Sequence, residues 1–279
     1  GVGGSTGRSG AAHGGQGGTG LSGTPSLISY GSIINPANYG SGCGGQSSVG
    51  CPGGGMIIIV VGGNMTLNSN IIVDGGFVSD RSAGSGGSIN ISANVFSGTG
   101  TFSAKGGVGL VNGAGAGGGR ISLKATSGDN TQFSGFTITA AGGATSGASY
   151  EDPSAGTIYL KSGSDITGAG IIWVHNEGVD SVKTTQLYPS SNIITDELLQ
   201  AQILITNSGN VTATSNLTVA NLLIRDTGTL TLNSNVLRIR RSEHSLENDN
   251  DSTPTGTSRV DTYNQITWDP PIGTVIILR

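Results

Sequence analysis

The sequence predicts an all-β protein built as a parallel β-helix (β-solenoid), with Gly-rich loops and an atypical Gly-rich N-terminal region. Glycine accounts for 51 of the 279 residues and charged residues for only 11%, whereas average chains hold about 7% glycine and about 25% charge. The abundant polar residues are Ser, Thr and Asn, which favour strands and turns over helix interiors. Apolar segments also recur at a nearly constant spacing, which is typical of stacked repeats.

The first repeats each begin with a short apolar strand that follows small residues. These strands are GGGMIIIV (53–60), GGSINIS (86–92), GGGRISL (117–123) and AGTIYL (155–160). If the isoleucines at 57, 89, 121 and 158 are equivalent, the spacings are 32, 32 and 37 residues. Units this small cannot bury a core alone, but a stack pairs each backbone with neighbours about 4.8 Å away. We therefore expect Ile57, Ile89, Ile121 and Ile158 to stack in register.

A second strand follows in each of these units and ends in a Gly-Gly pair. The segments are MTLNSNIIVDGG (65–76), GTGTFSAKGG (98–107) and FSGFTITAAGG (133–143). The variable parts are the Gly- and Ser-rich stretches 77–85, 108–116 and 144–155. Insertions at one point of every unit indicate a site that lies outside the coil.

After about residue 200 glycine becomes rarer and the spacing shortens. NVTATSNLTVANLLI (210–224) lies 19 residues before GTLTLNSNVLRI (228–239), which predicts coils of about 20 residues. Only residues 191–205 offer a short helical alternative. The motif Thr-Leu-Asn-Ser-Asn occurs twice and predicts internal amide ladders. The asparagines concerned are Asn68, Asn70, Asn233 and Asn235.

These patterns divide the chain into three regions. Residues 1–55 form a Gly-rich N-terminal cap or loop region, 56–240 the parallel β-helix, and 241–279 a C-terminal loop with a capping or donated strand. The N-terminal region has hardly any core-forming residues, so an ordered loop region, a flexible linker and extended polyglycine-like segments are all compatible with it. The segment YNQITWDPPIGTVIILR (263–279) predicts a strand that covers the end of the stack or pairs with another subunit.

Composition excludes several classes of protein. The net charge is −4 without a basic stripe, so nucleic acid is not an expected partner. No apolar run reaches the roughly 18–20 residues of a membrane-spanning helix, and no charged start precedes an apolar stretch as in a signal peptide. The glycines keep no three-residue period, which excludes collagen.

Cys43 and Cys51 are the only cysteines, and the glycine-rich loop between them could close a disulfide easily. Two free thiols are the alternative, and two cysteines alone cannot fill a structural zinc site. A disulfide would favour an oxidising compartment. Candidate glycosylation sites are the Asn-x-Ser/Thr sequons at Asn64, Asn90, Asn210 and Asn216.

The chemistry-bearing residues are scattered. His13, His175 and His244 are isolated from one another in the sequence, so we expect no catalytic triad. Polysaccharide-cleaving β-helices need converging carboxylates, but none here recur at the coil spacing. These carboxylates are Asp74, Glu151, Asp152, Asp165 and Asp180.

Two further kinds of segment resemble ligand sites only in part. EHSLENDNDS (243–252) offers Glu243, Glu247, Asp249 and Asp251 as oxygen donors but lacks the EF-hand offsets. We therefore read it as a solvated loop. The GxG clusters lack a following Lys-Ser/Thr, so they do not predict a phosphate site.

Several motifs resemble those of Gly-rich bacterial cell-surface proteins. They include HGGQGGTG (13–20), GSGGSINISA (84–93), SGTGTFSAKGGVG (97–109) and GAGGGRISL (115–123). Their rhythm is similar to that of filamentous-haemagglutinin-type adhesins and pectin-lyase-like repeats. The resemblance covers about residues 13–240 and implies a right-handed parallel β-helix, export to the cell surface, and a scaffold, fibre or adhesive role. The chain is shorter than the large adhesins, and its tail after residue 241 is not repetitive.

Together these observations predict a secreted structural or adhesive cell-surface protein, and a candidate subunit of an extracellular filament. We expect no catalysis, no cofactor and no metal site. The expected partners are other copies of the chain, or cell-surface and polysaccharide contacts. The alternative is a carbohydrate-binding or carbohydrate-degrading β-helix, which would cluster Asp with Tyr or Trp in a cleft. Ice binding by flat Thr-x-Thr rows is a third reading, because fragments of such rows occur at 137–139 and 229–231.

Overall fold

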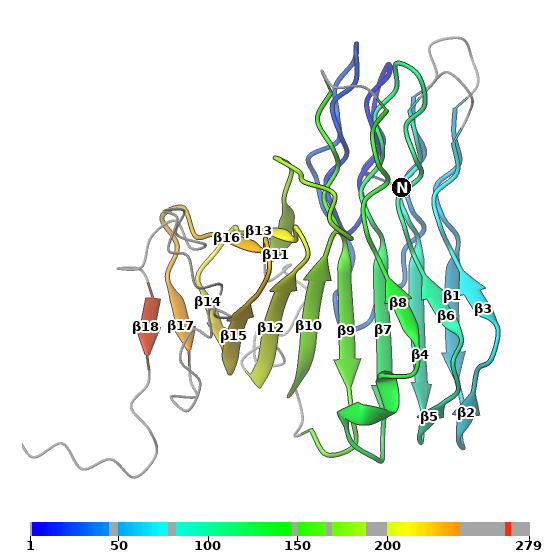
Figure 1. Cartoon of the computed structure of the whole chain (residues 1–279), viewed down its shortest axis with the longest axis vertical. Coiled ribbons are helices and arrows are strands. Elements are labelled where there is room, and N and C mark those ends of the chain that lie inside the picture. The colour runs from blue at the N-terminus through cyan, green and yellow to red at the C-terminus, as the bar shows by residue number, and fades with distance from the viewer. Residues whose placement is uncertain are drawn as a thin grey trace, which may run out of the picture.

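A computed structural model confirms the all-β class and shows two kinds of backbone (Figure 1). One part is a stack of short strands, and the other is a bundle of extended Gly-rich segments that continues from the strand ends. A single turn of 3-10 helix, Asn130–Phe133, interrupts the strands of the described part. The structure describes residues 2–44, 50–77, 82–146, 150–165, 169–187, 200–239 and 266–268.

The strands of the first set of repeats lie side by side in one seven-stranded sheet. In sheet order its strands are β1 (Met56–Val60), β4 (Ser88–Ala93), β7 (Arg120–Ala125), β9 (Thr157–Lys161), β10 (Ala169–His175), β12 (Gln200–Thr206) and β15 (Asn221–Ile224). The parallel register places Ile57 beside Ile89, Ile89 beside Ile121, and Ile121 beside Ile158. The predicted register of these isoleucines is therefore confirmed.

The strands that form the second part of each repeat belong to two smaller parallel sheets. These are β2 (Met65–Thr66) with β5 (Phe96–Ser97), and β3 (Asn70–Ile72) with β6 (Thr101–Ser103) and β8 (Thr137–Thr139). Phe102 pairs with Ile71 on one side and Ile138 on the other. These sheets and the large sheet enclose a first core that contains Ile89, Ile91, Phe96, Phe102, Ile121, Leu123, Ile158 and Leu160.

The second half of the chain stacks at the shorter spacing that its sequence predicts. Val211 pairs with Leu230 and Ile203 with Leu222, each 19 residues apart. The remaining strands are β11 (Thr185–Leu187), β13 (Asn210–Ala213), β16 (Thr229–Thr231), β14 (Leu217–Val219), β17 (Leu237–Ile239) and β18 (Ile266–Trp268). Strands β11, β13, β14, β16 and β17 enclose with the large sheet a second core, whose aliphatic residues include Ile172, Val174, Ile203, Ile205, Leu222 and Ile224.

The two cores lie on opposite faces of the large sheet. Ile158 and Leu160 of β9 belong to the first core, whereas Tyr159 between them belongs to the second, with Ile172 of β10. The core moves from one face of the sheet to the other where the strand direction reverses. At this point β10 pairs with β9 in the antiparallel sense and places Ile172 beside Tyr159. Connections between parallel strands keep the same handedness, so they lie on the opposite face of the sheet once the direction of the strands is reversed. Both faces of β9 are consequently buried.

The structure decides one open alternative and overturns one prediction. The described part of the segment with a helical alternative, residues 200–205, belongs to strand β12, as the all-β prediction requires, and it pairs with β10 and β15; residues 188–199 lie outside the described residues. The predicted internal asparagine ladders are wrong, since Asn68, Asn70 and Asn233 are exposed. Their motif marks turns and strand edges, where the amides reach the backbone: Asn68 Oδ1 accepts from the Thr99 amide at 3.3 Å.

The N-terminal region is an ordered part of the Gly-rich bundle. Its extended segments hydrogen-bond to the Gly-rich segments of the repeats, as in Gly14 N to Gly118 O at 2.9 Å and Gly18 N to Gly115 O at 3.0 Å. The segments approach so closely that only glycine fits. A Cβ on Gly118 would lie 1.7 Å from the Ala140 carbonyl oxygen. Residues 2–44 are thus built of extended polyglycine-like segments held by backbone hydrogen bonds.

In the described residues the strands are divided among five sheets, and a closed β-helix is not identified. The proposed boundaries at 55 and 240 stay predictions. Most of 241–279 lies outside the described residues, but β18 within it pairs in parallel with β17 and so extends the stack by one strand.

Candidate interaction surface

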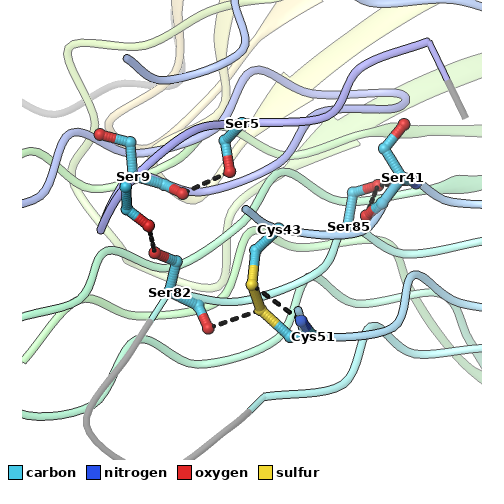
Figure 2. Close-up of a disulfide and its surroundings, with 8 residues drawn as sticks. Ser5, Ser9, Ser41, Cys43, Cys51, Ser82 and Ser85 are labelled. Atoms are coloured by element: carbon cyan, nitrogen blue, oxygen red, sulfur yellow. Dashed lines mark hydrogen bonds between the residues drawn. A yellow bond between two sulfur atoms is a disulfide. The ribbon is translucent and has the colours of Figure 1, made fainter. Parts of the chain in front are cut away.

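The disulfide fastens the N-terminal region at the start of the first repeat. The structure joins Cys43 to Cys51, whose Cα atoms are 5.1 Å apart, and the Cys43 amide donates to the Cys51 carbonyl at 3.1 Å. Figure 2 shows Ser41 and Ser85 beside it, where the Ser41 amide donates to Ser85 Oγ at 2.8 Å. Both cysteines are buried. The bond therefore holds the end of the N-terminal region against the segment that leads into the first repeat.

We expect loss of this disulfide to lower the free energy of unfolding by about 2–3 kcal/mol, because a short closed loop restricts the unfolded chain by about that amount. The measurement is denaturant unfolding of the wild type and of the Cys43→Ser/Cys51→Ser variant, each with and without reductant. Reductant should lower the midpoint of the wild type only. Equal midpoints for the wild type with and without reductant would contradict the expectation.

The four candidate glycosylation sites occupy different environments, and a fifth sequon, at Asn250, lies outside the described residues. Asn64 and Asn216 are exposed, whereas Asn90 and Asn210 lie half-buried in strands β4 and β13. The Asn210 amide nitrogen also donates to the Ser181 carbonyl at 2.8 Å. A glycan would therefore fit more easily at Asn64 or Asn216, and glycosylation at any of the four stays a prediction.

His13 and His175 are buried residues with lowered pKa values. His13 is fully buried, and its Nδ1 lies 2.8 Å from the Gly86 carbonyl oxygen. Burial, together with the charge of the buried Arg120, lowers the pKa of His13 to about 3. His175 stacks on Trp173 with ring centroids 4.2 Å apart, and burial lowers its pKa as well. His244 and the 243–252 loop lie outside the described residues.

The carboxylates are held by hydroxyl, backbone and lysine groups. Asp74 Oδ1 accepts from Ser103 Oγ at 2.6 Å and from the Lys105 amide at 2.7 Å, which joins two neighbouring repeats. Glu151 accepts from Thr19 Oγ1 and pairs with Lys183 at 2.7 Å, and the Lys183 interaction lowers its pKa. The other carboxylates named from the sequence also accept hydrogen bonds: Asp152 from the Thr145 amide, Asp165 from the amide and hydroxyl of Ser162, and Asp180 from the Ser208 hydroxyl.

Sequence reasoning missed Glu177. Its Oε2 pairs with Lys105 Nζ at 2.5 Å, and its Oε1 accepts from Thr139 Oγ1 at 2.7 Å. A positive φ of 51° at this residue marks a turn, which the sequence Asn-Glu-Gly could have indicated. Among the described residues, no group of three or more His, Cys, Asp or Glu side chains could hold a metal ion.

The apolar surface of most interest lies at the end of the stack formed by β1, β2 and β3, which we call the open end. Among the described residues, β1 is the edge strand of the large sheet and pairs on one side only, with β4. Its outward residues are exposed, Ile58 by 51% and Val60 by 81%, and Ile72 of β3 by 54%. Ile57 and Ile59 face the first core but are only partly buried. An uncharged, apolar edge strand of this kind is a template for pairing with another strand.

On the neighbouring repeats the same outer face is polar and covered. Segment 34–38 crosses it, so that Ser122 Oγ donates to the Ile34 carbonyl at 2.6 Å and Ser88 Oγ to the Asn38 carbonyl at 2.7 Å. Of strands β1, β4 and β7, β1 is therefore the one whose outward side chains are apolar and exposed. The open end is therefore the candidate interaction surface.

Comparison of the chain with family models, with curated proteins and with solved structures gave no match in any of the three. In the described residues no helix is long and apolar enough to span a membrane.

Proposed function

We propose that the chain is a secreted structural or adhesive protein of the cell surface, and that it assembles as a subunit of an extracellular filament. The observation that carries this proposal is the open end. A stack of parallel strands that stops at an uncharged, exposed apolar strand has the surface on which a further strand adds without a break. The role is mechanical, and it assigns no catalytic step to the chain.

The internal construction supports such a role. Each repeat satisfies its backbone on the repeats next to it, as in Gly75 N to Lys105 O and Gly106 N to Ala141 O, at 2.8 and 2.9 Å. The proposal includes the finer fold, in which both halves are β-solenoid stacks wound with the right-handed crossover that strands usually take. The resemblance to Gly-rich surface proteins points to the same extracellular role.

The carbohydrate alternative receives less support from the described residues. It requires carboxylates that converge beside aromatic rings, whereas Asp74, Glu151 and Asp180 are each held by hydroxyl groups of other segments. The Thr-x-Thr rows of the ice-binding reading are short, because Thr137 and Thr139 pair with Thr101 and Ser103, and the third row contains Asn70 and Ile72.

Negative-stain electron microscopy of the purified protein over a range of concentrations tests the proposal. We expect filaments that show an axial repeat and that lengthen as the concentration rises. Dispersed short particles at every concentration would contradict assembly. Antibody labelling of intact cells that produce the protein tests its location, and label that binds only after lysis would contradict export.

A further inference from the structure

We propose that the open end is the acceptor for residues 272–278 of a second copy of the chain, which would add as a strand beside β1. This inference rests on the proposed filament function and identifies the two surfaces that join its subunits. It uses the exposed strand β1 at one end of the stack and the stretch of sequence that comes after β18, the strand at the other end (Figure 1).

The acceptor requires an unusual partner, because both faces of β1 are apolar. Ile57 and Ile59 point towards the first core, while Ile58 and Val60 point to the outer face. Edge strands that stay exposed in folded proteins usually carry a charge, a proline or a bulge that blocks pairing. β1 contains none of these, since its sequence is Met-Ile-Ile-Ile-Val. A strand that covers it must therefore be apolar on both faces.

The segment 272–278, Ile-Gly-Thr-Val-Ile-Ile-Leu, has that property. Side chains alternate between the two faces of a strand, so Val275 and Ile277 would face one side, and Ile276 and Leu278 the other. It contains no charged residue before Arg279. The strands of the other repeats carry Ser, Asn, Lys or Thr on their outer face, as in Ser88, Asn90 and Ser92 of β4, so they match β1 less well.

The donor must come from another copy, because the segment cannot reach β1 of its own chain. In the large sheet, β15 is six strand steps away from β1. Strand β14 belongs to the same coil as β15, and β18 lies two further steps beyond β14. β18 is therefore about eight steps from β1. At about 4.8 Å per step the separation is roughly 38 Å. Ile272 follows Trp268 by four residues, which span at most about 14 Å when extended.

Pairing between the two ends of successive copies has a definite consequence for assembly. The two contact surfaces differ, so the interface is heterologous, and each added copy presents a new open end. Growth is then linear and does not stop at a dimer unless the rotation closes a ring. A variant that lacks either surface can still offer the other, which makes the two halves of the interface separable by experiment.

The test mixes two full-length variants and follows their size by sedimentation velocity. Ile58→Lys/Val60→Lys blocks the acceptor and leaves the donor, and Ile276→Lys blocks the donor and leaves the acceptor. Val182→Lys, at a site 69% exposed and outside the open end, is the matched control. The circular dichroism spectrum and the unfolding midpoint of each variant establish that it is folded.

We expect the wild type and Val182→Lys to form a series of linear oligomers. Each blocked variant alone should be monomeric, with association weakened at least about tenfold, since a charge would enter an apolar contact. Their equimolar mixture should stop at dimers, because only one acceptor and one donor remain. Monomers in that mixture would overturn the inference.

Two other outcomes separate this inference from the proposed function. If the wild type and Ile276→Lys both associate while the acceptor variant does not, β1 pairs with something other than 272–278, such as a second β1. The filament function then stands and the inference is overturned. If the wild type is monomeric at every concentration, both are overturned.

Discussion

Replacing Gly54 by alanine will lower the free energy of unfolding by about 3 kcal/mol or more, whereas replacing its neighbour Gly55 will change it by less than about 0.5 kcal/mol. A Cβ on Gly54 would lie 2.0 Å from the Val73 carbonyl oxygen and 2.4 Å from the Gly87 amide nitrogen, and all of these atoms belong to backbone. At Gly55 the nearest contact would be Val73 Cγ1 at 4.0 Å. The two positions are adjacent in the chain, but Gly54 is buried whereas Gly55 is exposed.

The reason for the large effect is that the neighbouring segments cannot move apart cheaply. Gly54 donates to the Ser85 carbonyl at 2.8 Å, and its own carbonyl accepts from Gly40 at 2.9 Å. Denaturant unfolding of the two variants is the measurement. If Gly54→Ala does not yield folded protein while Gly55→Ala does, the expectation is met in its extreme form. Equal stability of the two would show that the Gly-rich bundle is not packed as described.

Acid will destabilise the protein below about pH 6.5, and His13 will account for a large part of the loss. The pKa of His13 is about 3 in the folded protein against an ordinary value of 6.5. Between these values the unfolded chain binds a proton that the folded chain does not. The stability contribution of neutral His13 is therefore complete above pH 6.5 and is lost as the pH falls towards 3, at about 1.4 kcal/mol per pH unit.

The measurement is the unfolding midpoint from pH 7.5 to 4.5 for the wild type, His13→Asn and His175→Asn. An asparagine amide can still donate towards the Gly86 carbonyl, but it does not titrate. We expect a shallower pH dependence for His13→Asn, even if it is less stable at pH 7.5. A slope equal to that of the wild type would contradict the assignment. The His175→Asn variant isolates the second buried histidine, whose pKa is also lowered.

The stacking register could be predicted from sequence because it depends on a simple repeat. Ile57, Ile89, Ile121 and Ile158 follow small residues at similar spacings, and the structure pairs them directly. The 19-residue spacing in the second half is confirmed in the same way. In a stacked repeat protein, residues at equivalent positions of successive repeats contact one another, so the spacing of the repeat predicts the contacts.

The change of core face between β9 and β10 could not be predicted from the sequence. It depends on the direction in which β10 runs, and the composition of the strands does not indicate that direction. Ile158, Tyr159 and Leu160 are all buried, so β9 shows no alternation that would indicate a reversal. The asparagine ladders failed for a related reason. Repetition of a motif does not say whether it lies inside the coil or at a turn, and Asn68 and Asn233 lie outside.

The candidate interaction surface was only partly visible in the sequence. The apolar and β-branched residues of the C-terminal segment predict a strand that either covers the end of the stack or is donated to another subunit. The sequence does not indicate the strand that accepts it, because Met-Ile-Ile-Ile-Val (56–60) has the pattern of an ordinary buried strand. Only the structure shows that Ile58 and Val60 lie on an uncovered face at the edge of the sheet. The Gly-rich region was likewise ambiguous, since close backbone packing and disorder require similar compositions.

Methyl-labelled NMR of isoleucine and leucine side chains tests most directly whether neighbouring repeats stack in parallel register. We predict cross-relaxation between the methyl groups of Ile57 and Ile89, of Ile89 and Ile121, of Ile121 and Ile158, and of Ile91 and Leu123. Assignment by single Ile→Val substitutions would identify each signal. Cross-relaxation that instead connects Ile89 with residues of unrelated segments, or an antiparallel order of contacts between β4 and β7, would contradict the account.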